Sequence, residues 1–266
     1  MKAMTAEIKK ELLNLEKQHD IKVLYAVESG SRAWGFASTD SDWDVRYIYI
    51  HHLDWYLNID DKKDSQEKIL PNDIDLAGWE LKKALRLFRK SNPALLEWLR
   101  SPIVYLQPFS TADRLRELTK EYFNPKSCIH HYLHMAEGNF KEYLQKDMVK
   151  VKKYFYMLRP MLACDWIKQT NTMAPMEFQK LVDSQVTDQS VKTEIQNLLT
   201  RKIAGEELNE EPKNQILNDF LEQKIEFYND YVKTIQQPEH PDLAKLNELF
   251  RHTINEVWKI KNINIF

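Results

Sequence analysis

Two acidic residues at alternate positions, Asp42 and Asp44, are the most informative side chains in this sequence of 266 residues. They open the segment 42–50, whose Val, Ile and Tyr content predicts a β-strand. Side chains alternate along a strand, so both carboxylates are expected on one face, with Cα atoms about 6.6 Å apart. Like charges this close repel each other unless a positive charge lies between them. Because carboxylate oxygens are preferred ligands of Mg²⁺, the spacing predicts a site for one divalent cation, or for two about 3.5–4 Å apart.

A glycine-serine turn precedes this strand. Residues 22–29 (KVLYAVES) predict a buried strand that stops at Gly30, where glycine permits a positive φ and close approach of the backbone. If a short helix begins at Ser31, its free N–H groups and its dipole favour phosphate, to which Ser31 would add a hydroxyl and Arg32 a cation. Phosphoryl and nucleotidyl transfer need little beyond a phosphate cradle and a metal site. Each feature alone is common in surface turns, but the ordered combination is much rarer.

The elements around these residues predict an α+β fold with two parts. In residues 1–110 we expect a helix over 5–19, strands over 22–29, 42–50, 73–81 and 102–106, a charged loop over 57–72, and helices after Leu81 and Asn92. These elements indicate a small mixed sheet flanked by helices, the catalytic domain. Residues 111–266 show only helical periodicity and predict an all-helical domain, with helices over 125–147, 151–169, 188–204, 212–235 and 242–260.

Composition excludes several classes of protein. Hydrophobic residues make up 43% of the chain, enough for a core, and 5 glycines and 10 prolines are too few for collagen-like or low-complexity sequence. The formal charge of −2 excludes a globally basic nucleic-acid-binding surface but not a local basic patch. Cys128 and Cys164 are too few for a disulfide framework, and we expect packed, reduced thiols. With no apolar run long enough for a membrane helix and no signal-like N-terminus, a cytoplasmic protein is expected.

The motif residues resemble a known superfamily. Gly30-Ser31 followed by Asp42-Trp43-Asp44 is similar to the signature of the DNA polymerase β-type nucleotidyltransferases. The longer string ESGSRAWGFASTDSDWDVRYIYI (28–50) resembles one branch, the predicted nucleotidyltransferases of the RNA-repair-pathway DNA polymerase β family, and so do segments 78–105 and 152–167. The resemblance covers about residues 20–170.

The resemblance implies roles for individual residues. It makes Asp42 and Asp44 metal ligands and Gly30 and Ser31 phosphate-loop positions. A third carboxylate is expected from a later strand, where it also helps to deprotonate the attacking hydroxyl. Asp75 is the best match, with Asp73 and Glu80 as rivals.

The resemblance also implies a nucleotide-contacting helical segment around residues 150–160. Lys152, Tyr156 and Arg159 share one face of a regular helix there, so the two cations would bind the triphosphate. The alternative is a solvated basic face on a core helix.

Together these features predict a nucleotidyltransferase. A nucleoside triphosphate such as ATP would bind with two Mg²⁺ ions, or Mn²⁺, while the helical domain closes over it. An acceptor hydroxyl would attack the α-phosphorus and release pyrophosphate. The resemblance favours an RNA 3′ end as acceptor, in RNA or tRNA repair. A protein or small-molecule hydroxyl is the first alternative, and a binding module without catalysis the second.

Other patterns are interpreted as structural. His130, His131 and His134 lack the further ligands that a zinc site needs, so we expect a partly buried helix face. Trp34 is expected to pack, with base stacking as the alternative. A basic helix is expected to be a solvated face, with nucleic-acid backbone contact as the minority alternative; its residues are Lys82, Lys83, Arg86, Arg89 and Lys90.

Overall fold

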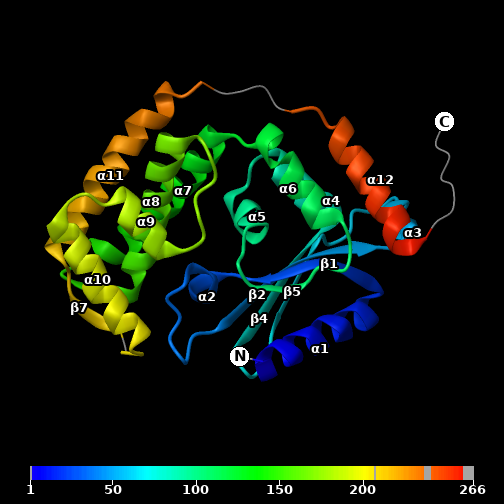
Figure 1. Cartoon of the computed structure of the whole chain (residues 1–266), viewed down its shortest axis with the longest axis horizontal. Helices are drawn as coiled ribbons and strands as arrows, with labels where there is room; N and C mark the ends of the chain where they lie inside the picture. Colours follow the sequence, from blue (N-terminus) through cyan, green and yellow to red (C-terminus); the bar gives the residue numbers. More distant parts are fainter. Residues whose placement is uncertain (1, 207, 237–240, 260–266) are drawn as a thin grey trace.

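The computed structural model describes residues 2–206, 208–236 and 241–259. Figure 1 shows two lobes side by side: residues 2–122 with 244–258, the sheet lobe, and residues 125–234, the helical lobe. The strands are β1 Ile21–Glu28, β2 Trp43–His51, β3 Ser65–Ile69, β4 Ile74–Glu80, β5 Val104–Leu106, β6 Met148–Lys150 and β7 Glu210–Pro212. The α-helices are α1 Lys2–His19, α2 Gly30–Trp34, α3 Leu53–Tyr56, α4 Leu81–Arg89, α5 Pro93–Trp98, α6 Thr111–Tyr122, α7 Pro125–Asn139, α8 Phe155–Thr170, α9 Phe178–Gln185, α10 Gln189–Ile203, α11 Gln215–Thr234 and α12 Ala244–Trp258.

A five-stranded mixed sheet with the order β3-β4-β2-β1-β5 forms the centre of the sheet lobe. The middle strand, β2, pairs antiparallel with β1 and parallel with β4. Because β2 and β4 run in the same direction, their amino-terminal ends meet at one edge of the sheet. At that edge Asp44 lies opposite Asp75.

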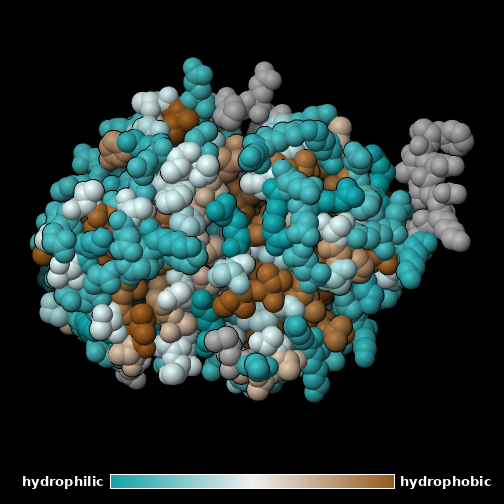
Figure 2. Space-filling model, in the orientation of Figure 1, coloured by the Kyte–Doolittle hydropathy of each residue, from teal (hydrophilic) through white to brown (hydrophobic). Residues whose placement is uncertain are grey.

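Helices cover both faces of this sheet. On one face, α1 packs Ile8, Leu12 and Leu15 against apolar residues of β1, β2 and β4. On the other face, α4, α5 and α6 cover Ile48 and Ile50 of β2. This second core continues without interruption into the helical lobe, where α7 packs against α8 and α9–α11 surround the pair. The residues of both cores are buried, and on the face drawn in Figure 2 hydrophilic side chains cover most of the surface, with hydrophobic ones in smaller groups.

The last described helix, α12, returns to the sheet lobe and packs across α4 and α6 (Figure 1, red). The Ser110 amide donates a hydrogen bond to Glu256 Oε1 at 3.0 Å, and Trp258 Nε1 donates to the His51 carbonyl at 2.9 Å. The helical lobe is therefore an insertion between two parts of the sheet lobe. The predicted boundary at residue 110 falls at the start of α6, which packs on β1, and the division into domains 1–110 and 111–266 stays a prediction.

The predicted α+β class is confirmed, and so are the four predicted strands of the sheet and the capped helix starts at Asn92 and Asn124. Two local predictions were wrong. Residues 57–72 contain the edge strand β3 (SQEKI), which is polar and lacks the alternation that marks a half-buried strand. The helical lobe contains the small β6–β7 sheet, whose three-residue strands are too short for a detectable pattern.

The structure also bears on two expectations from the composition, which concern the cysteines and the membrane-spanning helices. Cys128 on α7 and Cys164 on α8 are buried free thiols, as expected. No helix within the described residues has the length and apolar character that crossing a membrane requires.

Candidate active site

Asp44 and Asp75 form a pair across the parallel strands β2 and β4. The guanidinium of Arg46, two residues along β2, bridges them: its Nη2 lies 2.9 Å from Asp44 Oδ1 and 2.9 Å from Asp75 Oδ2. Burial raises the pKa of the Asp44 carboxyl; Arg46 opposes this shift, and the carboxylates of Asp75 and Asp42 add to it. The edge of the sheet thus concentrates negative charge, as the spacing of the acidic residues predicts.

The turn at Gly30 lies directly against Asp44. The Ser29 amide donates to the Asp44 carbonyl at 2.8 Å, and Gly30 then adopts φ +56° at the start of α2. A Cβ atom at Gly30 would lie 2.0 Å from Asp44 Oδ2, so only glycine fits between the turn and the carboxylate. The structure therefore brings the predicted phosphate turn and the predicted metal ligand into contact.

A fully buried carboxyl, Glu28, supports this edge from behind. Glu28 Oε1 accepts a hydrogen bond from the Asp44 amide at 2.8 Å, and Glu28 Oε2 accepts one from the Tyr105 hydroxyl. Burial raises the pKa of Glu28 to about 7. Sequence reasoning missed Glu28, since a carboxylate at a strand end carries no signal of its depth.

Arg32 shapes the loop before β2. Its Nε donates to the Asp42 carbonyl at 3.0 Å, a second nitrogen bonds the Ser41 carbonyl, and its guanidinium stacks 3.7 Å over the Trp43 ring. These contacts hold Asp42, which immediately precedes β2, beside Asp44. The predicted phosphate contact of Arg32 would have to form in addition to them.

The three candidates for the third carboxylate occupy different places. Asp75 shares Arg46 with Asp44. Asp73 is exposed, with φ +59°, and its carbonyl accepts from the Trp43 amide at 2.8 Å. Glu80 lies buried at the far end of β4, where it caps α4 by accepting from the Lys82 and Lys83 amides. Of the three, Asp75 is the one that the strand register places beside Asp44.

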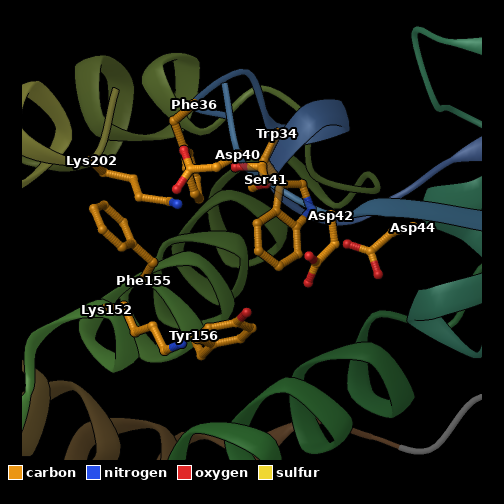
Figure 3. A pocket seen from close by; sticks show the side chains of 11 residues that line it. Trp34, Phe36, Asp40, Ser41, Asp42, Asp44, Lys152, Phe155, Tyr156 and Lys202 are labelled. Carbon is orange, nitrogen blue, oxygen red and sulfur yellow. The ribbon is translucent and has the colours of Figure 1, made fainter. Parts of the chain in front are cut away.

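A cavity of about 280 Å³ opens in front of Asp42 and Asp44, between the two lobes. Figure 3 shows both carboxylates directed into it, opposite Lys152, Tyr156 and Lys202. The side chains that line it are Ser31, Trp34, Phe36, Asp40, Ser41, Asp42, Asp44, Lys152, Phe155, Tyr156 and Lys202. We call Ser31, Asp42 and Asp44 the sheet wall, and Lys152, Tyr156 and Lys202 the helical wall.

The helical wall contains one residue that sequence reasoning missed. Lys202, in the last turn of α10, donates from Nζ to Ser38 Oγ at 3.0 Å. Basic residues are common in the last turn of any helix, so its position carries no specific signal. Burial raises the pKa of the Tyr156 phenol, and the carboxylates of Asp44 and Asp42 raise it further. The two walls therefore interact electrostatically across the cavity.

Arg159 does not join Lys152 and Tyr156 at the cavity. It is 2% exposed, and its Nη1 forms an ion pair with Glu97 Oε1 of α5 at 2.7 Å, while the Tyr132 hydroxyl also bonds Glu97. Tyr156 and Arg159 both belong to α8, where a spacing of three residues sets their side chains about 60° apart around the helix axis. Arg159 lies on the side of α8 that packs toward Glu97 of α5, whereas Tyr156 lies on the side that faces the cavity. Neither the predicted triphosphate contact nor a solvated face describes this buried arginine.

The residues that the sequence analysis interpreted as structural have the following positions in the fold. Trp34 packs edge-on to Tyr156, with ring centroids 6.1 Å apart, and also lines the cavity. His130 and His134 lie with their Nε2 atoms 3.1 Å apart on α7. Within the described residues, no group of three or more His, Cys, Asp or Glu side chains is placed to hold a metal ion. On α4, Lys83 pairs with Asp64, and Lys82 and Arg86 are exposed.

The three aspartates at the sheet edge are not gathered into a three-ligand group within the described residues, but their chemistry suits a hard cation. Asp42, Asp44 and Asp75 offer only carboxylate oxygens, which Mg²⁺ and Mn²⁺ accept. The guanidinium of Arg46 already stands between two of the three carboxylates as a positive charge.

The sequence of this chain matches a known protein family. The match is to the RNA repair pathway DNA polymerase beta family, over residues 4–252. The chain belongs to this family. The resemblance noted over residues 20–170 is thereby confirmed and extends through most of α12. Family membership indicates a nucleotidyltransferase.

Two similar proteins extend the comparison. The uncharacterized protein YcgL of Bacillus subtilis (strain 168) is 46% identical over 256 residues, which cover 96% of this chain and 98% of that protein. A nucleotidyltransferase-like protein from Exiguobacterium sibiricum aligns with 95% of this chain and 89% of its own, at 9% identity and a TM-score of 0.32. The Bacillus protein is thus similar to this chain over nearly the whole length of both, whereas the structural likeness is too weak to carry an argument.

Proposed function

We propose that this chain transfers a nucleoside monophosphate from a triphosphate to an acceptor hydroxyl, in the cavity between the two lobes. The observation that carries the proposal is the position of Asp42 and Asp44 in the cavity opposite two lysines, with Asp44 against the Gly30 turn and beside Asp75 of the neighbouring strand. Carboxylates on one side and cations on the other are what a metal-bound polyphosphate requires.

Asp42, Asp44 and Asp75 would hold divalent ions such as Mg²⁺ or Mn²⁺. When bound, these ions supply the positive charge that stabilises the attacking and leaving oxygens. Asp75 Oδ1, the oxygen that Arg46 does not bridge, would accept the proton of the acceptor hydroxyl.

The rest of the cavity would position the nucleotide. The ammonium groups of Lys152 and Lys202 would neutralise the phosphates as point charges, and the Ser31 hydroxyl would donate to a phosphate oxygen. Trp34 and Tyr156, which are not fully buried, present aromatic side chains on which a base would stack.

We propose an RNA 3′ end as the acceptor, in RNA or tRNA repair. The support is the family to which the chain belongs, whose description names RNA repair. The open side of the cavity leaves room for an acceptor beside Asp42, which is exposed.

Transfer of label from α-³²P-nucleoside triphosphates tests the proposal. The full chain is incubated with each triphosphate and Mg²⁺, with RNA of defined 3′ end, with an unrelated protein, or alone. We expect metal-dependent labelling of RNA, its loss in EDTA, and its loss in Asp44→Ala. Labelling of protein in place of RNA would move the acceptor to a protein hydroxyl, and triphosphate binding without transfer would indicate a binding module.

Two substitutions on β4 and the loop before it sharpen this test. Asp75→Ala is expected to lower transfer at least 100-fold, because it removes a ligand and the proton acceptor. Asp73→Ala is the matched control, expected to stay within about threefold of wild type. An active Asp44→Ala protein with an unchanged rate would refute the assignment.

A further inference from the structure

Arg46 occupies an unusual place for a cation in a site proposed to bind metal. It lies on the same face of β2 as Asp44, and it points back toward the end of the strand where Asp44 and Asp75 meet. Besides the two carboxylates, its Nη1 bonds the Asp75 carbonyl at 3.0 Å and the Val45 carbonyl at 3.2 Å. Four oxygen atoms thus hold one guanidinium, whose side chain is 19% exposed.

The guanidinium does what a bound cation would do at this edge. Asp44 and Asp75 face each other across neighbouring strands, which lie about 4.8 Å apart, so their negative charges repel strongly where water is partly excluded. One nitrogen atom, Nη2, bonds an oxygen of each and cancels that repulsion. A divalent ion bound between the same two carboxylates would carry out the same neutralisation.

We propose that Arg46 is the internal counter-ion of the metal-free site, and that a divalent cation competes with its guanidinium for Asp44 and Asp75. The inference rests on the proposed function. Arg46 is a positioning residue here: it holds the two carboxylates together before the ion arrives.

This competition couples the metal to the nucleotide. While Arg46 neutralises the pair, an added dication would leave the site with excess positive charge, so the free ion binds weakly. A triphosphate brings several negative charges, which offset both the dication and the guanidinium. The ion therefore enters together with the nucleotide, and the empty site keeps its geometry without metal.

Mn²⁺ titration followed by the electron paramagnetic resonance signal of the free ion tests the proposal without measuring activity. In Arg46→Gln we expect the Kd for Mn²⁺ alone to fall at least tenfold relative to wild type. With a non-hydrolysable triphosphate present, the two proteins should differ by less than about threefold. Arg86→Gln is the matched control: it removes the same charge from an exposed position on α4 and should leave the Kd unchanged.

Arg46→Lys keeps the proposal testable if the glutamine variant does not fold. The lysine ammonium lacks the planar fork with which arginine reaches two carboxylates and two carbonyls, so it should compete less well with the ion. The Kd of the Arg46→Lys protein for Mn²⁺ should therefore be about threefold lower than that of wild type. A Kd equal to or higher than that of wild type in the folded Arg46 variants would overturn the proposal.

The outcome is separable from that of the proposed function. If Asp44→Asn weakens Mn²⁺ binding but Arg46→Gln leaves it unchanged, the metal site stands and the counter-ion role fails. If wild type shows no metal-dependent transfer to any acceptor, the proposed function fails, whatever the Kd values.

Discussion

The two walls of the cavity differ in how the chain assembles them. The sheet wall comes from residues 31–44, one continuous segment that contains α2, the loop after it and the start of β2, and whose geometry follows from local spacing. The helical wall combines Lys152 and Tyr156 with Lys202, about fifty residues later in the sequence, and only packing of α8 against α9 and of α10 against α11 brings them together. Local spacing can therefore be recognised in a sequence, whereas a wall built by tertiary packing cannot.

Substitution of Arg159 is expected to have the largest effect and tests whether this residue belongs to the helical core or to the nucleotide site. We expect Arg159→Met to lower the free energy of unfolding by about 3–5 kcal/mol, because it leaves Glu97 buried without its partner. The KM for triphosphate should not change. Urea unfolding and steady-state kinetics measure the two quantities. In the double variant with Glu97→Gln, much of the stability should return; normal stability with a raised KM would instead place Arg159 at the nucleotide.

Glu28 tests how far the sheet wall depends on its buried support. Its pKa is raised from 4.5 to about 7, so between these pH values the folded protein holds a proton that the unfolded chain has lost. The free energy of unfolding should therefore fall as the pH rises through this window, by at most about 3 kcal/mol. Glu28→Gln keeps an acceptor for the Asp44 amide and should lack this decrease. Urea unfolding at pH 4.5 and pH 8 measures it, and parallel pH profiles for both proteins would contradict the expectation.

Alanine substitutions at Gly30 and Gly35 distinguish the effect of backbone strain from the effect of a methyl group that contacts the site. Both have positive φ, +56° and +88°, so Ala at either position should cost about 1–2 kcal/mol of stability. Only Gly30→Ala drives a methyl group into Asp44, whereas a Cβ at Gly35 meets nothing within 4 Å. We expect Gly30→Ala to lower kcat about 100-fold and Gly35→Ala to change it less than threefold. Equal kcat values would show that the turn does not position Asp44.

The lysines of the helical wall should produce the smallest effects. Lys152→Ala and Lys202→Ala are each expected to raise the KM for triphosphate about tenfold, or about 1.4 kcal/mol, with kcat nearly unchanged. Lys180→Ala on α9, where Lys180 pairs with Glu177 away from the cavity, is the control. A fall in kcat without a change in KM would move these lysines from nucleotide binding to the reacting centre.

The sequence predicted the sheet wall better than the helical wall, because the sheet wall is formed by one local segment. The strand that begins next to Asp42 and carries Asp44 was predicted, because alternation and the glycine turn act over a few residues. Asp75 was named from the family resemblance, and the parallel register that brings it beside Asp44 appears only in the fold.

The helical segment could not be predicted to the same depth. Arg159 and Tyr156 lie on adjacent sides of α8, and it is the packing of Glu97 of α5 beside Arg159 that buries the arginine while the tyrosine lines the cavity. Lys202 and Glu28 were missed because their roles depend on what packs around them. Periodicity in the sequence predicts which segments form helices and strands. The role of an individual side chain depends on the contacts between those elements, which the sequence does not show.

The return of α12 to the sheet lobe means that the helical lobe is tethered at both of its ends. The chain joins the two lobes at two places along the sequence, before α7 and again between α11 and α12, so any relative movement of the lobes has to satisfy both connections. Cutting the chain after α11 would therefore loosen the alignment of lysines and carboxylates across the gap, even though no residue of the cavity had been altered.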